Sequence, residues 1–417
     1  MTTFLFPVLL FLLCIASAYF LFTIYAAWRF FRQPFSSSLS SLPPVSLFKP
    51  LKGATPELYE QLASFCRLDY PCFQLLCGVG DPQDQAAVVV KQLQQAFPTC
   101  DITLITNPPI IGTNAKVSTL HRLAQEARYD IFVISDGDVS VPPDYLRRLI
   151  PPLLDSDIGL VTCPYRGEVA TPFPACIESL MMNTSFAPQV LVASQVEKTT
   201  YAFGATMAIK RHCLDKIGGF LTLADYLADD YYLGYFVTQA GYNARIVLPV
   251  VETHPSVRTL SELFHHQVRW SRTQRTCRSM GYYSTLITYG TVWALLGLLL
   301  FWSSPLLSSV ALGTLGLRLL SAGIVGGAFL GSSLTLKTLW IVPLADIISF
   351  LVWAVSLFGD TVRWGEHTFR VNRNGKMYPL TGPPPITLHT LPTATTAGEG
   401  TQQLDETARV ARNSPLW

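Results

Sequence analysis

The sequence predicts an α/β domain of the nucleotide-binding kind, held at a membrane by apolar helices before and after it in the chain. Three observations lead to this fold class. The 417 residues are 49% hydrophobic and only 14% charged, which is too apolar for an ordinary soluble enzyme. Strand-like and helix-like segments alternate between residues 45 and 258, the pattern of parallel strands joined by right-handed crossovers. Long apolar segments lie on both sides of this region.

The N-terminal segment 2–28 carries no charge and is long enough to cross a bilayer core of about 30 Å. Its basic flank, Arg29 and Arg32, follows the segment, and no basic residue precedes it. A cleaved signal peptide has its positive charge in front and a shorter apolar core, so we expect an uncleaved anchor over residues 1–30. Because positive flanks stay cytoplasmic, the N-terminus is expected outside and the next domain in the cytosol.

Charge and cysteine usage argue against other classes of protein. The net charge of +2 is too small to indicate a nucleic-acid partner. The nine cysteines are scattered along the chain without a CxxC pair. An odd number at such spacings predicts reduced thiols in a cytosol-facing protein, and neither a disulfide framework nor a structural zinc site.

A Ser/Pro-rich linker over residues 31–44 leads into the α/β domain, residues 45–258. The strands are expected at 45–53, 73–77, 102–105, 131–134, 158–162, 201–210 and 244–251. The helices are expected over 56–67, 83–97, 115–128, from 142 onward and over 225–240. Residues 165–200 show no clear periodicity. The G-x-G-x-x-G dinucleotide fingerprint and the Walker A sequence are both absent.

Basic and apolar segments alternate after this domain. Residues 259–280 predict an amphipathic helix that lies in the membrane interface with its arginines toward lipid headgroups. Membrane helices are expected within 281–360. Their apolar segments lie near 283–302, 305–330 and 339–358. Arg318 and Asp346 lie inside two of these segments, where polar groups are expected to face protein rather than lipid.

The expected membrane topology conflicts with itself. An anchor with its N-terminus outside, followed by three full spans, would leave the tail outside too. The basic segment 361–386 argues instead for the cytosol. We therefore expect one segment to be re-entrant or interfacial, and the Gly/Ser-rich middle one is the candidate. The remainder, 387–417, is rich in Thr, Ala and Gln and is expected to be disordered.

Two aspartates follow the buried strand 131–134. Asp136 and Asp138 flank a glycine at the carboxyl end of the strand, where open α/β sheets bind their ligands. Carboxylates at this spacing can share one divalent cation and the phosphates that it carries. In isolation the same three residues are also a common polar turn at the end of a strand.

Three further features suit the same edge of the sheet. Asp81 follows the second strand and can accept hydrogen bonds from a base or ribose, or simply form a turn before its proline. Asp230, on the helix 225–240, can take the proton from an attacking hydroxyl, or can be an exposed acid near a helix start. Arg269 and Trp270 suit a diphosphate clamp and a stacking platform, or membrane anchoring. Together these residues indicate sugar transfer from a nucleotide donor at a membrane surface.

At this point the chain resembles a known family, the ceramide glucosyltransferases and their bacterial relatives, which include hopanoid-associated glycosyltransferases. The similar stretches occur in the same order over about residues 45–280. They are VSLFKPLKG, LDYPCFQLLCGVGDP, IGTNAKV, YDIFVISDGDVSVPPDYL, FGATMAIKRHCLDKIGGF, YLADDYYLG and VRWSRTQR. The resemblance implies a GT-A catalytic fold.

The family pattern of D, DxD, D and (Q/R)xxRW implies a role for each candidate residue. Asp81 would bind the nucleoside, Asp136 and Asp138 the metal and diphosphate, and Asp230 would be the base. Arg269 and Trp270 complete the pattern, and Asn114 and Lys116 fall in a family motif near the donor. His266 departs from the pattern, which has Gln or Arg there. Either His266 substitutes as a hydrogen-bond donor or this position is dispensable.

The resemblance implies an inverting transfer of a hexose from a UDP-sugar to a membrane lipid hydroxyl, with Mg²⁺ or Mn²⁺ as cofactor. Ceramide glucosylation is the nearest named reaction. The rival within the class uses UDP-N-acetylglucosamine and a hopanoid polyol. A processive polysaccharide synthase is disfavoured because only three C-terminal apolar segments could build a channel. A non-catalytic lipid-binding membrane protein is disfavoured by the complete set of acids.

Overall fold

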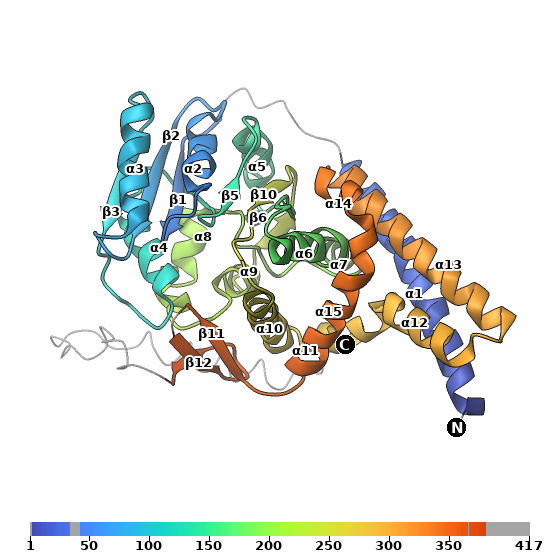
Figure 1. Ribbon diagram of the computed structural model, residues 1–417. Coiled ribbons are helices and arrows are strands. Elements are labelled where there is room, and N and C mark those ends of the chain that lie inside the picture. Colours follow the sequence, from blue (N-terminus) through green and yellow to red (C-terminus); the bar gives the residue numbers. More distant parts are fainter. Residues whose placement is uncertain (1, 34–41, 366, 381–417) are drawn as a thin grey trace.

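The computed structural model describes residues 2–33, 42–365 and 367–380. Figure 1 shows a sheet flanked by helices on one side of the molecule and a group of long helices on the other. This arrangement confirms the predicted fold class. Most of the expected linker and the whole tail 387–417 lie outside the described residues.

A seven-stranded mixed sheet forms the centre of the α/β domain. Its order is β3-β2-β1-β4-β8-β6-β9. The strands are β1 (Val45–Leu51), β2 (Phe73–Val79), β3 (Ile102–Thr106), β4 (Ile131–Ile134), β6 (Ile158–Thr162), β8 (Met207–Lys210) and β9 (Asn243–Ile246). Strands β1 to β4 pair in parallel, as predicted.

Strand β8 corrects the expectation of uniformly parallel strands. It runs antiparallel to both of its neighbours, β4 and β6. The expected strand 201–210 is confined to residues 207–210. The connection into β8 passes through helices on the membrane side, so the chain re-enters the sheet from the opposite end and no right-handed crossover precedes this strand.

The expected strand 244–251 is divided between two sheets. Strand β9 ends at Ile246, and a cis peptide bond joins Leu248 to Pro249. Strand β10 (Val251–Thr253) then enters a small sheet between β5 (Val139–Ser140) and β7 (Tyr165–Gly167). This small sheet extends directly from the segment that holds the two aspartates.

Helices cover both faces of the central sheet. They are α2 (Leu58–Cys66), α3 (Gln85–Ala96), α4 (Ala115–Glu126), α5 (Tyr145–Leu153), α8 (Arg211–Lys216) and α9 (Asp229–Gln239). Successive residues of a strand point to opposite faces of the sheet, so they enter two separate hydrophobic cores. Leu47 and Val133 pack with α2, α3 and α5, whereas Phe48 and Phe132 pack with α4, α8 and α9. Burial on both faces explains the continuous apolar runs that identified these strands.

The stretch that lacked a readable pattern forms three consecutive helical segments. They are α6 (Phe173–Met181), the π-helix η1 (Met182–Phe186) and α7 (Ala187–Val196). Helix α6 packs against the C-terminal helices, and α7 packs against the N-terminal one. Nearly all of α6 is buried, so its sequence shows no alternation between an apolar and a polar face.

Four apolar helical segments flank or follow the α/β domain, and three of them are long and apolar enough to span a membrane by themselves. They are α1 (Thr2–Phe31), α12 (Gly290–Phe301), α13 (Pro305–Ser321) with its π-helical continuation η4 (Ala322–Phe329), and α15 (Val342–Ser356). Segments 4–31, 305–329 and 339–356 each meet the criteria for a span. Segments 279–288 and 290–301 meet them only as a pair bent by 43°. The bend lies in the first C-terminal segment, whereas the middle segment, which we expected to be re-entrant or interfacial, is long and apolar enough for a span.

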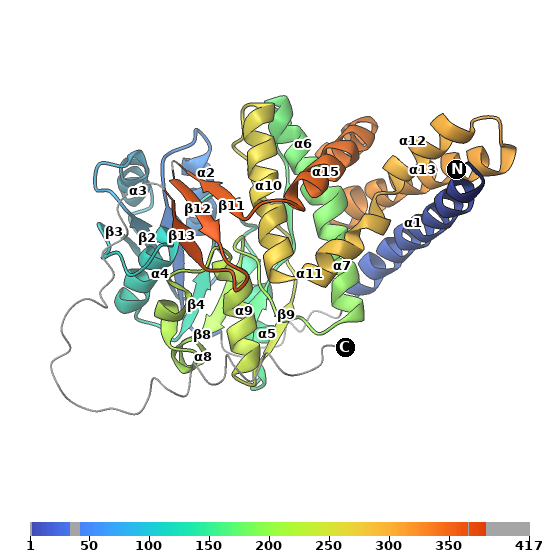
Figure 2. The ribbon, with the colours of Figure 1, turned by 90° about the horizontal axis from the view of Figure 1, so that it is seen from below.

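The chain returns to the α/β domain after α15 (Figure 2). Strands β11 (Thr361–Trp364), β12 (His367–Val371) and β13 (Met377–Pro379) form a small sheet. Met377 N donates to Asp225 O at 2.8 Å, and Leu227 N donates to Gly375 O at 3.1 Å. Because this sheet and the α/β domain lie on the same side of any membrane, the helices between them cross an even number of times.

Candidate active site

The acidic residues gather where the strands end. Asp81 follows β2, Asp136 and Asp138 follow β4, and Asp230 lies in the first turn of α9. All four line one cavity of about 2190 Å³, together with Lys116, Arg269 and Trp270. The same cavity extends to the apolar helices, where Tyr19, Phe20, Thr23, Arg318 and Ser321 line it. The cavity therefore joins the acidic edge of the sheet to the predicted membrane region.

Lys116 neutralises part of this acidic cluster. Its Nζ lies 2.6 Å from Asp136 Oδ1 and 3.2 Å from Asp229 Oδ2. Burial alone would lower the pKa of Lys116, but Asp136, Asp229 and Asp230 together raise it above the usual value. Asp229 Oδ2 is buried, and the ion pair with Lys116 is the polar contact that the described residues give it. One cation thus pairs with two carboxylates and lies in the field of a third, Asp230, which leaves negative charge at the site.

Asn114 supports Lys116 from outside the cavity. Its side chain has no exposed surface. The amide oxygen caps the N-terminus of α4 by accepting from Val117 N at 3.1 Å, and the amide nitrogen donates to Tyr226 O at 2.8 Å. Asn114 is thus not among the residues that line the cavity, and it holds the N-terminus of the helix that carries Lys116.

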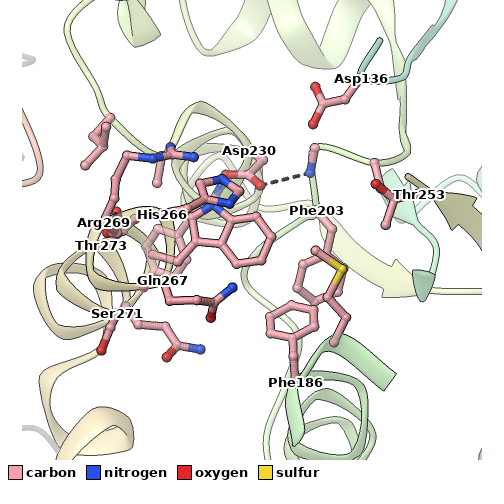
Figure 3. A pocket seen from close by; sticks show the side chains of 18 of the residues that line it. Asp136, Phe186, Phe203, Asp230, Thr253, His266, Gln267, Arg269, Ser271 and Thr273 are labelled. Atoms are coloured by element: carbon pink, nitrogen blue, oxygen red, sulfur yellow. Dashed lines mark hydrogen bonds between the residues drawn. The ribbon is translucent and has the colours of Figure 1, made fainter. Parts of the chain in front are cut away.

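Gly204 brings Asp136 and Asp230 together. Its N–H donates to Asp230 Oδ2 at 2.9 Å, and its carbonyl accepts from Asp136 N at 3.2 Å (Figure 3). A Cβ at this position would lie 2.6 Å from Asp136 Oδ2, so a larger residue here would displace the Asp136 carboxylate. Burial and the neighbouring Asp229 raise the pKa of Asp230 to about 6, against the opposing effect of Lys116. A carboxyl group with such a pKa is suited to accept a proton near neutral pH.

Asp138 is held by the small sheet. Its Oδ2 accepts from the Thr253 hydroxyl at 2.8 Å, and burial together with Asp136 raises its pKa. Behind the pair, Lys49 has no exposed surface and donates to Ser135 Oγ at 3.3 Å. Burial lowers the pKa of Lys49 to about 8, although both aspartates oppose this. Lys49 therefore supplies positive charge beneath the turn.

Asp136 and Asp138 fit a cation that is shared with a phosphate-bearing ligand. The described part of the chain contains no group of three or more His, Cys, Asp or Glu side chains that could hold a metal ion. Mg²⁺ in phosphate-transferring sites is commonly held by one or two carboxylates, with phosphates and water completing its shell. Two carboxylates beside an open cavity match this kind of site and do not match a cage built by the protein alone.

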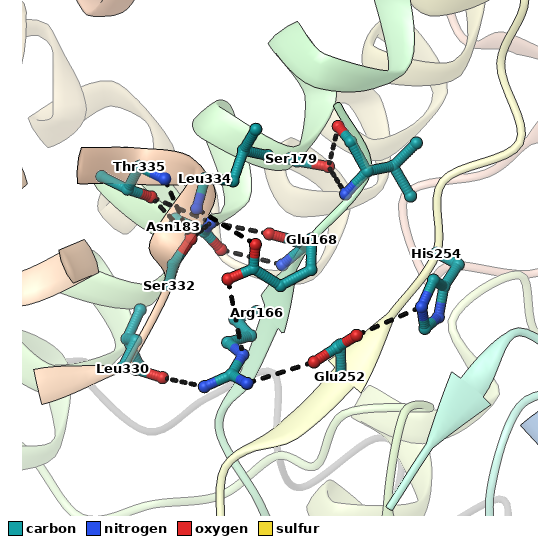
Figure 4. A network of polar contacts seen from close by, with 12 residues as sticks. Arg166, Glu168, Ser179, Asn183, Glu252, His254, Leu330, Ser332, Leu334 and Thr335 are labelled. Atoms are coloured by element: carbon teal, nitrogen blue, oxygen red, sulfur yellow. Dashed lines mark hydrogen bonds and ion pairs between the residues drawn. The ribbon is translucent and has the colours of Figure 1, made fainter. Parts of the chain in front are cut away.

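A polar network anchors the small sheet to the apolar helices (Figure 4). Arg166 on β7 donates to Glu252 on β10 at 3.1 Å and to the carbonyl of Leu330 at 2.6 Å. Glu252 also lies 3.2 Å from His254, whose backbone N–H donates to Asp138 O at 3.1 Å. The hydrogen bond from His254, together with Arg166, lowers the pKa of Glu252. The segment that carries Asp138 is thus linked by polar contacts to the end of η4.

Helix α10 (Leu260–Cys277) forms the wall opposite the sheet. Arg269 and Trp270 both line the cavity, and the Arg269 guanidinium lies 5.8 Å from the Trp364 ring centroid. Burial lowers the pKa of Arg269, while the charges of Glu178, Asp136 and Asp230 oppose that shift. Figure 3 shows Arg269 and His266 projecting from α10 beside Asp230. The predicted clamp therefore shares a cavity with the predicted base.

Two other arginines of α10 differ from the expectation of headgroup contacts. Arg272 donates to Phe358 O at 2.9 Å, and Arg275 donates to Ser356 O at 2.6 Å. These carbonyls lie at and just beyond the C-terminal end of α15, where intrahelical donors are lacking. The guanidinium groups cap that helix end, and they tie α10 to α15.

Asp81 keeps both of its predicted roles open. Its Oδ1 accepts from Gln83 N at 2.8 Å, which is the turn that the following proline indicated. The side chain is exposed at the cavity wall, so the same carboxylate is accessible to a ligand.

Several lining residues were not predicted from the sequence. An aromatic group formed by Tyr165, Phe186, Tyr201 and Phe203 lines the cavity near the membrane side. Two of these residues fall in the segment without periodicity. One signal was present there, because Glu178 is the only charged residue between positions 169 and 196. A lone acid in an apolar segment indicates a buried polar contact or a functional site.

The overall fold matches that of a solved glycosyltransferase. A mannosyltransferase from Pyrobaculum calidifontis, in complex with GDP-Man and Mn²⁺, aligns with a TM-score of 0.50 and 20% sequence identity. The alignment covers 83% of this chain and 99% of that one. This likeness shows a GT-A-like fold, which here carries apolar helices consistent with membrane anchoring.

The chain belongs to glycosyl transferase family 21, whose profile matches residues 8–377. Two similar relatives are ceramide glucosyltransferases of Caenorhabditis elegans. Ceramide glucosyltransferase 3 is 28% identical over 226 residues, which are 54% of this chain and 48% of the relative. Ceramide glucosyltransferase 1 is 29% identical over 233 residues, 55% of this chain and 49% of the relative. The chain thus matches about half the length of these relatives, and the predicted family resemblance is confirmed.

Proposed function

We propose that the protein transfers a hexose from a UDP-sugar to the hydroxyl group of a membrane lipid, with inversion at the anomeric carbon. The observation that carries this proposal is the continuous cavity. It has Asp136 and Asp230 at one end and the apolar helices α1 and α13 at the other. A lipid can keep its apolar chains among these helices while its hydroxyl reaches Asp230. We further propose that the α/β domain faces the cytosol, where UDP-sugars are available.

The donor would lie along the acidic edge of the sheet. Asp81 would accept hydrogen bonds from the nucleoside, and Arg269 and Trp270 would hold the diphosphate and the sugar from the α10 side. Asp136 and Asp138 would hold Mg²⁺ or Mn²⁺, which, when bound, offsets the charge of the departing diphosphate. Lys116 already pairs with Asp136, so its ammonium group is placed to share this task.

Asp230 would act as the general base. Its carboxylate takes the proton of the lipid hydroxyl as that oxygen bonds to the anomeric carbon from the face opposite the diphosphate. The bond between the anomeric carbon and the phosphate oxygen breaks, and its electron pair leaves with UDP. The Gly204 N–H bond to Asp230 Oδ2 fixes the direction of the carboxylate.

Product analysis tests this proposal. The full chain in membranes is supplied with UDP-glucose and ceramide, and in parallel with UDP-N-acetylglucosamine and a hopanoid polyol, and new glycolipids are identified by mass spectrometry. We expect a single added hexose on ceramide, and none with the D230N variant. A ladder of longer products would support a polysaccharide synthase instead, and product from neither pair with either metal ion would contradict the proposal.

A further inference from the structure

Helix α6 buries one carboxylate beside the membrane helices. Glu178 has no exposed surface, and its neighbours Ala175, Ile177 and Leu180 belong to an apolar cluster. An ionised carboxylate in such surroundings is unfavourable unless hydrogen-bond donors surround it. Its partners therefore show what this carboxylate does.

Both of its partners come from helix α10. Glu178 Oε1 accepts from His266 Nδ1 at 2.6 Å and from Gln267 Nε2 at 2.8 Å. Since a carboxylate only accepts, the proton of this bond is on His266 Nδ1. Oε2 is buried and receives no hydrogen bond from the described residues. The carboxylate is thus fully dependent on α10 for its hydrogen bonds.

The His266 ring is held on a second side by Trp270. The two ring centroids are 4.6 Å apart, and the planes are tilted by 53°. The residues lie one helical turn apart, and both line the same cavity as Asp230. Arg269 lies between them in the sequence, within the electrostatic field of Glu178. The position of Trp270 therefore depends on a ring whose orientation is set by Glu178.

We propose that Glu178 is a positioning residue that fixes the His266 ring and, through it, holds Trp270 in the wall of the cavity. The only demand on residue 266 is then a hydrogen-bond donor that reaches Glu178 Oε1. Glutamine and arginine also carry such donors, so histidine is a functional replacement here and residue 266 is not dispensable. This inference rests on the proposed function and deepens it, because it gives the cavity that holds the base a residue that controls the shape of its wall.

The test uses the two donors to Glu178 as a matched pair. H266L removes the imidazole that donates to Glu178 and contacts the Trp270 ring. Q267L removes a donor to Glu178 at a similar distance, but this side chain has no ring contact with Trp270. We expect similar melting temperatures for these variants. We expect kcat/KM to fall at least about tenfold with H266L, and to stay within about threefold with Q267L and with H266Q. Equal losses with H266L and Q267L would show that Glu178 is merely structural, and would overturn the proposal.

Two further comparisons complete the test. The double variant E178L/H266L removes the same Glu178–His266 contact as the single variant E178L, and both leave Gln267 Nε2 without its acceptor, so the double variant should be no less active than E178L. Multiplied losses in the double variant would contradict the coupling. A loss with H266Q as large as with H266L would assign proton transfer to the imidazole and would also contradict the proposal.

UDP affinity, measured by calorimetry on the detergent-solubilised chain, gives a second readout. A wild-type protein that binds UDP without transferring sugar would contradict the proposed function, while the ranking of the variants in UDP affinity would still decide the role of Glu178.

Discussion

Two clusters of buried charge line the same cavity, and they are built in opposite ways. In the apolar helices, Arg318 donates to both carboxylate oxygens of Asp346, at 2.6 and 2.9 Å, and to Thr184 O at 2.8 Å. The Thr291 hydroxyl completes the cluster with a further bond to Asp346. At the edge of the sheet, Lys116 Nζ pairs with two carboxylates, Asp136 at 2.6 Å and Asp229 at 3.2 Å, and Asp230 lies within its electrostatic field.

The difference separates a network whose charges balance from a cluster that keeps unbalanced negative charge. Arg318 and Asp346 satisfy one another, which confirms that they face protein, as the sequence predicted. The edge cluster keeps an excess of negative charge and a proton acceptor whose pKa is raised to about 6. Strongly shifted carboxyl groups in a cavity are typical of functional sites. Substitutions in the edge cluster should therefore change catalysis, and substitutions in the membrane cluster should change stability.

The largest expected effect is that of Asp230→Asn. Asparagine keeps the shape and can still accept from Gly204 N, but it cannot take a proton. We expect kcat to fall by about 10³-fold or more, with an unchanged melting temperature, in assays of UDP release with lipid acceptor. A variant that retains more than about a tenth of the activity would remove Asp230 from the role of base.

Asp346→Leu should give the opposite pattern. It leaves Arg318 buried without its charge partner, and breaking a buried ion pair costs about 3–5 kcal/mol. We expect a large fall in folded protein, measured as melting temperature in detergent, with near-normal activity per folded molecule. The double variant R318L/D346L serves as control and should recover part of the stability. If D346L instead lowered turnover in fully folded protein, the membrane cluster would belong to the catalytic machinery.

Lys116→Gln sharpens the comparison through its pH dependence. In the wild type, kcat/KM should rise with pH through about 6, because deprotonation of Asp230 produces the base. Lys116 lowers the pKa of Asp230, so its removal should move this limb to higher pH and reduce kcat/KM at pH 7 about tenfold or more. The pH profile of both proteins checks this. A limb that stays in place, or moves to lower pH, would contradict the assignment of the limb to Asp230.

The features that could be predicted from the sequence are those that depend on residues close together in the chain. Buried parallel strands appear as short apolar runs, and the acids at their carboxyl ends must meet at one edge. For this reason the sequence pattern alone was enough to assign Asp81, Asp136 and Asp138 to one edge of the sheet. Asp230 was placed there by its position on the helix that follows the turn at Gly218.

The remaining features depend on contacts between distant segments. The direction of β8 is set by where the chain returns from the membrane side, which no periodicity within residues 165–200 reveals. Glu178 is 88 residues from His266, and Thr253 is 115 residues from Asp138. Arg272 and Arg275 looked like headgroup ligands because their partners, the carbonyls at the end of α15, lie more than 80 residues further along. Pairings over such separations are decided by tertiary packing.

The smallest effects come from two hydroxyl groups that each donate to a carboxylate, one in either cluster. Thr253→Val removes the bond to Asp138 Oδ2, which orients a predicted metal ligand. We expect the Mn²⁺ or Mg²⁺ concentration for half-maximal activity to rise about tenfold, since loss of such outer contacts weakens metal sites by about 10–100-fold. Thr253→Ser keeps the donor and should behave as the wild type.

Thr291→Val removes the matching hydroxyl from Asp346 in the membrane cluster. Here the carboxylate keeps both of its bonds from Arg318, so we expect a loss of only about 1–2 kcal/mol in stability and no change in the metal requirement. Metal titrations and melting curves on both variants measure the two quantities side by side. Two outcomes would contradict the division of the clusters between folding and catalysis: a changed metal requirement with Thr291→Val, or an unchanged one with Thr253→Val. In either case the same hydroxyl-to-carboxylate bond would serve the same purpose at both ends of the cavity.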